Sequence, residues 1–193
     1  MNGSIQTTSA VILAGGASSR MGRCKAELDF HGETLLSHTI NKLRSLGLRD
    51  IVISGARTDA ESVRTVPDIY PGRGPLGGIH AALLAIQNPA AMVLAVDTPL
   101  LPVSLLRELI EAHRGGITLL THGELIEPLI GIYDRAVARD CEALLRGDSS
   151  SLRRLIGSLG YTAYPFNGDA AVLSNCNTPE EYLRALRYSE QNQ

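Results

Sequence analysis

Residues that can bind phosphate gather near the start of the chain, where a short apolar run ends in two glycines. The run Ala10–Ala14 is followed at once by Gly15 and Gly16, and Arg20 and Lys25 come soon after. A glycine-rich loop leaves backbone N–H groups free, while an arginine fork and a lysine charge can hold separate phosphates. The stretch therefore predicts either a polyphosphate site or an ordinary strand-to-helix turn with two surface cations.

Two known phosphate-binding motifs can be tested against these glycines. The opening loop is not a Walker A motif, because Gly22 is followed by Arg instead of Lys and Ser or Thr. Residues 72–77 match the letters of the dinucleotide fingerprint, but Pro71 precedes them and Pro75 lies inside. That fingerprint must follow a strand and open a helix, so we reject it. The segment instead indicates a shaped loop entering a helix near Leu76, whose positive end could serve a phosphate or a base edge.

Two further polar groups could complete a site. Asp97 ends the apolar run Ala91–Val96, and Pro99 prevents the strand from continuing. Ligands of open α/β sheets bind at the carboxyl ends of strands, so Asp97 is either a Mg²⁺ ligand or a turn cap. Asn175 and Asn177 face the same way if their segment is extended. Two hypotheses follow. The asparagines bind a second substrate or the water shell of a metal, or one of them only caps the next helix.

The order of the elements predicts how these residues meet. Strand-like runs alternate with helical patterns, which indicates one α/β domain over residues 1–193 with a largely parallel sheet, after a disordered tail over residues 1–8. The expected strands are about 10–14, 50–54, 64–67, 91–96, 117–121, 129–133 and 161–166. The expected helices are about 34–47, 58–64, 76–86, 103–113, 134–146, 150–158 and one from Pro179, where Thr178 and Glu181 form a capping box.

The composition disfavours several classes of function. The net charge of −2, the aromatic fraction of 4% and the absence of Trp argue against nucleic-acid binding. Three widely separated cysteines argue against a zinc module and a disulfide framework. We find neither a signal peptide nor an apolar run of membrane-spanning length, so we expect a cytoplasmic protein that binds neither nucleic acid nor membrane.

Taken together, the motifs resemble those of the molybdenum cofactor guanylyltransferases, which belong to a larger nucleotidyltransferase superfamily. The matching segments are Leu13-Ala-Gly-Gly16, Arg20-Met-Gly22, Lys25, Asp68, Pro71-Gly72, Gly74-Pro-Leu-x-Gly-Ile79, Val96-Asp-Thr-Pro99, Glu127-Pro-Leu129 and Asn175-x-Asn-Thr-Pro179. The resemblance implies a three-layer, Rossmann-like α/β fold with a predominantly parallel, mixed sheet and helices on both faces. It also implies transfer of GMP from GTP to the terminal phosphate of molybdopterin that carries molybdenum, with Mg²⁺ as cofactor and pyrophosphate as product.

The resemblance also implies roles for single residues. The residues expected to bind the nucleotide are Leu13, Ala14, Gly15, Gly16, Lys25, Asp68 and Asp97. Asn175 and Asn177 are expected to lie on the molybdopterin side of the site, and Asp97 is expected to bind Mg²⁺. Catalysis is expected to rest on Arg20 and Lys25, which face the leaving pyrophosphate, together with Asp97. Cys24 stands where the family usually has Asp, and Ser54 or Ala56 where it more usually has an Asn near the base.

Three readings of the function therefore stay open. The Leu-Ala-Gly-Gly start favours guanine, but the alternatives are a cytidylyl- or sugar-1-phosphate nucleotidyltransferase of the same superfamily. A chain that binds GTP without catalysis, as a regulatory or assembly protein, is a third reading, against which Asp97 and the two loop cations argue. The first reading also implies transient contacts with cofactor-insertion proteins or molybdoenzymes.

Overall fold

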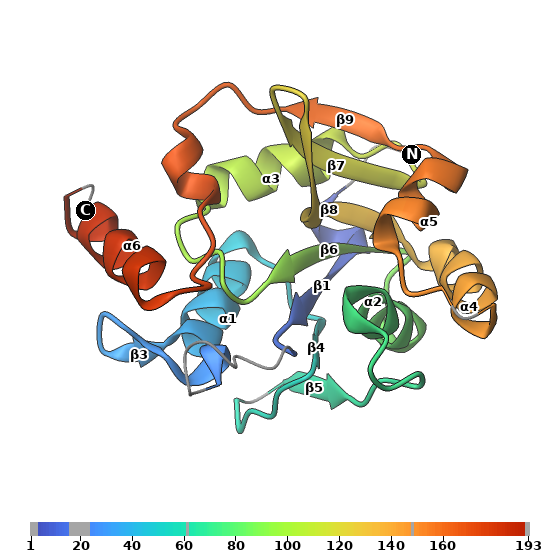
Figure 1. Cartoon of the computed structure of the whole chain (residues 1–193), viewed down its shortest axis with the longest axis horizontal. Coiled ribbons are helices and arrows are strands. Elements are labelled where there is room, and N and C mark those ends of the chain that lie inside the picture. The colour runs from blue at the N-terminus through green and yellow to red at the C-terminus, as the bar shows by residue number, and fades with distance from the viewer. Residues whose placement is uncertain (1–3, 16–23, 61, 148, 192–193) are drawn as a thin grey trace.

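A seven-stranded sheet divides the protein into three layers in the computed structural model, which describes residues 4–15, 24–60, 62–147 and 149–191 (Figure 1). Its strands are β1 (Thr8–Leu13), β4 (Ile51–Ser54), β5 (Val63–Val66), β6 (Ala90–Ala95), β7 (Ile117–His122), β8 (Leu125–Asp134) and β9 (Thr162–Pro165). Their order across the sheet is β5-β4-β1-β6-β8-β7-β9. Within the described residues, β8 alone runs against its neighbours β6 and β7. The expected α/β fold with a mostly parallel, mixed sheet is confirmed.

Helices cover both faces of the sheet (Figure 1). They are α1 (Leu35–Leu46), α2 (Gly74–Ala85), α3 (Val103–Ala112), α4 (Ala138–Arg146), α5 (Leu152–Leu159) and α6 (Pro179–Gln191). The cluster on one face contains buried side chains of α1, α3 and α6, and that on the other face contains those of α2, α4 and α5. None of the helices in the described part of the chain is long and apolar enough to cross a membrane.

The central strand β6 shows why the sheet is buried on both sides. Met92 and Leu94 join one hydrophobic cluster, whereas Ala91 and Val93 join the other, and all four are at most 1% exposed. Successive side chains of a strand point to opposite faces, so an uninterrupted apolar run suits a strand covered on both sides. The run ends at the sheet edge where Asp97 begins the next loop.

Three local features differ from the expectations. Residues 4–8 are structured, since Ile5–Thr7 form a 3-10 turn and Thr8 begins β1; Ile5 packs against the core, which orders the predicted tail. Residues 58–60 and 62–64 contain no helix, because β-branched Val63 opens β5 instead. A small hairpin of β2 (Asp29–Phe30) and β3 (Glu33–Thr34), placed before α1, was not predicted.

The predicted capping box at α6 is present. Glu181 N donates to Thr178 Oγ1 at 3.2 Å, and Thr178 N donates back to Glu181 Oε2 at 3.1 Å. The same carboxylate oxygen also accepts from Asn177 N at 2.8 Å. The cap therefore satisfies the N–H group of Glu181 in the first turn and fixes the two residues just outside the helix.

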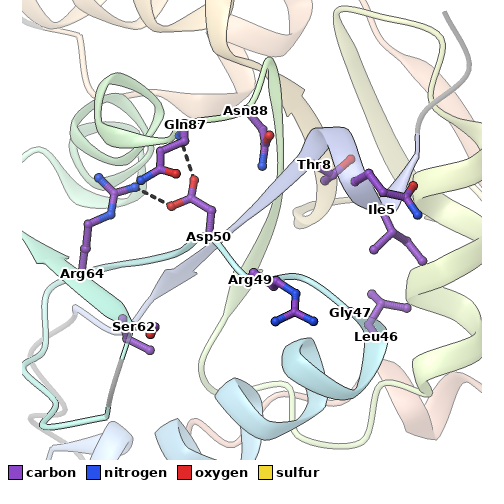
Figure 2. Close-up of a pocket in the computed structure, with 12 residues that line it drawn as sticks. Ile5, Thr8, Leu46, Gly47, Arg49, Asp50, Ser62, Arg64, Gln87 and Asn88 are labelled. Atoms are coloured by element: carbon purple, nitrogen blue, oxygen red, sulfur yellow. Dashed lines mark hydrogen bonds and ion pairs between the residues drawn. The ribbon is translucent and has the colours of Figure 1, made fainter.

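A cavity of about 820 Å³ lies at the opposite end of the sheet, among the amino ends of β1, β4 and β5 (Figure 2). Asp50 lines this cavity, and its carboxylate accepts hydrogen bonds from Arg64 Nη2 at 2.5 Å, Ser9 Oγ at 2.5 Å and Gln87 N at 2.8 Å. Burial alone would raise the pKa of Asp50, but these donors together hold it below the ordinary 3.8. Asp50 thus joins two strands to the residues after α2, and its hydrogen-bonding capacity is used within the protein.

We expect Asp50→Ala to lower the free energy of unfolding at pH 7 by about 2 kcal/mol, because three donors lose a charged acceptor. Because the pKa is lowered on folding, this stabilisation is complete above about pH 4 and is lost as the pH falls through the folded-state pKa. Urea unfolding followed by far-ultraviolet circular dichroism measures both effects, since the chain has no Trp. The exposed Asp59→Ala is the matched control. Equal stability of the two variants at pH 7 contradicts the prediction.

Candidate functional site

The loops that leave β1, β4 and β6 are joined by backbone hydrogen bonds at one edge of the sheet. Ala14 N donates to Ser54 O at 2.8 Å, and Val96 N donates to Leu13 O at 3.1 Å. Cys176 N donates to Asp97 O at 2.8 Å, which adds the segment before α6. Four stretches that are far apart in the sequence therefore form one continuous rim.

Lys25 lies at the centre of this rim. Its Nζ is 2.6 Å from Asp97 Oδ2 and also donates to Asn177 Oδ1. The Lys25 side chain is 21% exposed and that of Asp97 15%, so the ion pair is partly shielded from water. Because Asn177 is fixed by the α6 cap, the lysine is held by a loop, a strand end and a helix start.

One cavity beside the ion pair has a volume of about 560 Å³. It is enclosed by the ends of three strands, the 72–78 segment and Lys25. Its lining residues are Leu13, Ala14, Gly15, Lys25, Ser54, Asp68, Gly72, Gly74, Pro75, Gly78, Ala95, Val96, Asp97 and Leu129. The cavity combines apolar walls with a cation and two carboxylates, a lining that suits a polar ligand with a flat apolar part.

The far wall of this cavity depends on small residues in the first turns of α2. A Cβ added at Gly78 would lie 2.8 Å from Ser54 Oγ and 3.1 Å from Leu13 Cδ2. Ser54 Oγ in turn donates to Asp68 Oδ1 at 2.8 Å. The glycine thus leaves room for a contact that holds Asp68 at the cavity wall.

A second cavity, of about 370 Å³, adjoins the first and shares Pro75, Ala95, Asp97 and Leu129 with it. The rest of its lining is Thr98, Glu127, Pro128, Ile130, Leu152, Asn175 and Asn177. Asp97 therefore lies on the boundary between the two spaces. Two ligands placed one in each cavity would both lie next to the Lys25–Asp97 pair.

The loop after Asp97 is held by α1. Lys42 Nζ donates to Pro99 O, and His38 Nε2 lies 3.3 Å from the same oxygen. Burial lowers the pKa of Lys42 to about 8. Nearby, burial raises the pKa of the Cys176 thiol to about 12. Cys176 therefore stays a neutral thiol between the two asparagines and is unsuited to act as a nucleophile.

The structure brings together the predicted residues that it describes. Leu13, Ala14, Gly15, Lys25, Asp68 and Asp97 all line the larger cavity, and Asn175 and Asn177 line the smaller one with Asp97. Gly16 and Arg20 lie outside the described residues. Four residues that line the cavities, Pro75, Gly78, Glu127 and Leu129, matched the family motifs but were not predicted as site residues. The two adjacent glycines in the first turns of α2 were the available signal for a close approach there.

Comparison with known proteins identifies the family of the chain. Residues 10–163 match the model of the MobA-like NTP transferase domain. The chain belongs to this family. It is therefore an enzyme, a nucleotidyltransferase. A probable molybdenum cofactor guanylyltransferase of Carboxydothermus hydrogenoformans is 37% identical over 193 residues, covering 95% of this chain and 97% of the relative. A molybdenum cofactor guanylyltransferase of Rhizobium johnstonii is 34% identical over 194 residues, covering 93% and 92%.

A solved structure shares the fold. Molybdopterin-guanine dinucleotide biosynthesis protein A from Archaeoglobus fulgidus aligns with a TM-score of 0.78 at 22% identity, covering 95% of this chain and all of that one. The alignment places this MobA-like chain in the Rossmann-like α/β class that its motifs implied.

The contact between Gly55 and Gly15 gives a structural test of the rim. Gly55 has φ +90°, and a Cβ there would lie 2.2 Å from Gly15 Cα. We expect Gly55→Ala to lower the free energy of unfolding by about 2 kcal/mol or more, because strain and a backbone overlap combine. The control is Gly32→Ala, at φ +85° with nothing within 4 Å of its added Cβ. Urea unfolding compares them, and equal losses would contradict a close approach of the two loops.

Proposed function

We propose that this MobA-like nucleotidyltransferase transfers GMP from GTP to the terminal phosphate of molybdopterin that carries molybdenum, and releases pyrophosphate. The observation that carries the proposal is the position of Asp97 and Lys25 between two adjoining cavities. The larger cavity takes the nucleotide and the smaller one takes the acceptor. The names of the relatives support guanine and molybdopterin as the two substrates.

The reaction joins two phosphates and needs no group that removes a proton. An oxygen of the acceptor phosphate attacks the α-phosphorus of GTP, and the bond from that phosphorus to the bridging oxygen of the β-phosphate breaks. The electron pair leaves with pyrophosphate. The attacking phosphate is already an anion near neutral pH, so the site has to position two anions and neutralise their charge.

The residues around the ion pair suit that task. Lys25 brings a positive charge to the boundary of the two cavities, where phosphate oxygens of either ligand can share it. We assign Arg20 a role beside Lys25, in binding the phosphates that leave as pyrophosphate, as the sequence motif implies. Asn177 holds Lys25 from the acceptor side, and Asn175 lines the same cavity. Asp68 and Ser54 lie on the wall that we assign to the nucleoside.

Asp97 fits a Mg²⁺ ion that is bound together with substrate. Among the described residues no group of three or more His, Cys, Asp and Glu side chains gathers to bind a metal alone. Mg²⁺ usually takes one or two carboxylates together with phosphate oxygens and water, and one oxygen of Asp97 has no partner among the described side chains. When bound, the ion would supply positive charge to the transferring phosphate.

We expect Asp97→Ala to reduce pyrophosphate release by about a thousandfold or more in the presence of GTP, Mg²⁺ and molybdopterin, because the charge-bearing group between the cavities is removed. The assay is pyrophosphate release at saturating substrates, with circular dichroism to confirm folding. Glu180→Ala, an exposed carboxylate at the start of α6, is the control. Near wild-type turnover by Asp97→Ala would rule out the assigned metal role.

The choice of base is tested separately, because the phosphate-binding groups do not distinguish bases. We expect calorimetry to show tighter binding of GTP than of CTP or UTP, and pyrophosphate release to require both GTP and molybdopterin. A preference for CTP or UTP would indicate the cytidylyl- or sugar-1-phosphate transferase. GTP binding without pyrophosphate release would indicate a regulatory or assembly protein.

A further inference from the structure

The smaller cavity contains one carboxylate that the proposed reaction does not use. Glu127 lies in β8 and lines the cavity together with Asp97 and the two asparagines. Leu94 of β6 pairs with Ile130 of β8 in antiparallel register. This is the last pair of the β6–β8 ladder; beyond it, β6 leads on to Asp97 and β8 leads back, through an irregularity in its pairing with β7, to Glu127. Both segments therefore run toward the same edge of the sheet.

Three other polar side chains of this cavity each have at least one partner within the protein. Asp97 and Asn177 contact Lys25, and Thr98 Oγ1 donates to Ala95 O at 2.9 Å. No side chain or backbone group of the described residues donates a hydrogen bond to Glu127, although its side chain is partly buried. Burial raises the pKa of Glu127 above its ordinary value, and the opposing effect of the nearby His122 is smaller. A half-buried carboxylate without donors is satisfied when a ligand supplies them.

The cavity also has an uneven distribution of charge. Lys25 lies at the boundary with the larger cavity and attracts an anion there, whereas the Glu127 carboxylate repels one. Proline and aliphatic side chains, Pro75, Pro128 and Leu129 among them, line the space between polar groups and suit the faces of a flat ring. A matching ligand has a phosphate at one end and N–H donors on the edge of a ring at the other.

We propose that Glu127 selects the acceptor by accepting hydrogen bonds from the 2-amino-4-oxo edge of its pterin ring. That edge has two adjacent donors, the ring N3–H and the 2-amino group, which match the two oxygens of a carboxylate. The inference rests on the proposed function, because it assumes that the acceptor is a pterin phosphate. It adds a specificity-determining residue to a site whose other groups act on phosphates.

The test compares the binding of pterin and of lumazine, the same ring with a 2-oxo group in place of the 2-amino group. Their fluorescence reports binding directly in a chain without Trp. We expect the wild-type chain to bind pterin at least about tenfold more tightly than lumazine, since lumazine places an oxygen against the carboxylate. Glu127→Gln should abolish or reverse this preference, because its amide N–H₂ can donate to the 2-oxo group.

Two further variants separate ring recognition from a general effect. Glu127→Asp keeps the carboxylate and should keep the preference for pterin. Glu124→Gln, at an exposed position in the turn before β8, should leave both affinities unchanged. Circular dichroism confirms that each variant is folded. A wild-type chain without a preference for pterin, or a Glu127→Gln variant that retains the preference, overturns the inference.

Failure of this inference can be distinguished from failure of the proposed function. Pyrophosphate release from GTP with molybdopterin tests the reaction, and ring binding needs no turnover. Turnover without a ring preference removes only the role of Glu127. A ring preference that depends on Glu127, without turnover, supports that role and removes the proposed reaction.

Discussion

The contact of Lys25 with Asp97 and Asn177 is the interaction on which the arrangement of the site depends. It joins the loop after β1, the end of β6 and the segment before α6 at one point. Asp97, one partner in this contact, lines both adjoining cavities, so the contact places a paired positive and negative charge at their boundary. A partly shielded ion pair between a lysine and a carboxylate also keeps both charges in place, because each would be costly to leave unpaired.

The parallel arrangement of the strands makes this convergence possible. β1, β4 and β6 are adjacent and parallel, so their carboxyl ends deliver three loops to one edge. The antiparallel β8 enters that edge from the opposite direction and contributes residues from its beginning instead of its end. The acceptor cavity consequently combines strand-end loops with the first half of a long strand. Each of the two cavities has a wall that the other lacks.

Much of this organisation could be predicted from local patterns. The apolar run before Asp97 predicted a strand, and Thr178 with Glu181 predicted the start of α6; both are confirmed. Local patterns say little about which loops meet across the sheet. The antiparallel direction of β8, the contact of Gly55 with Gly15 and the pairing of Ser54 with Asp68 all join residues distant in sequence. The sequence therefore identified Glu127 as part of a family motif, but could not predict that it lines a cavity with Asp97.

The capping box of α6 also links the stability of a helix to the occupancy of the site. Glu181 holds Asn177, which contacts Lys25, while Ala185 is the residue of α6 that the described structure buries fully. A peripheral helix with little buried surface opens locally at low free-energy cost. A ligand that requires Asn177 in place binds only the docked form of α6. Ligand binding must then stabilise α6 against local unfolding by the same free energy by which docking of α6 favours ligand binding. Amide hydrogen exchange in this helix therefore reports on ligand binding at a cavity that the helix itself does not line.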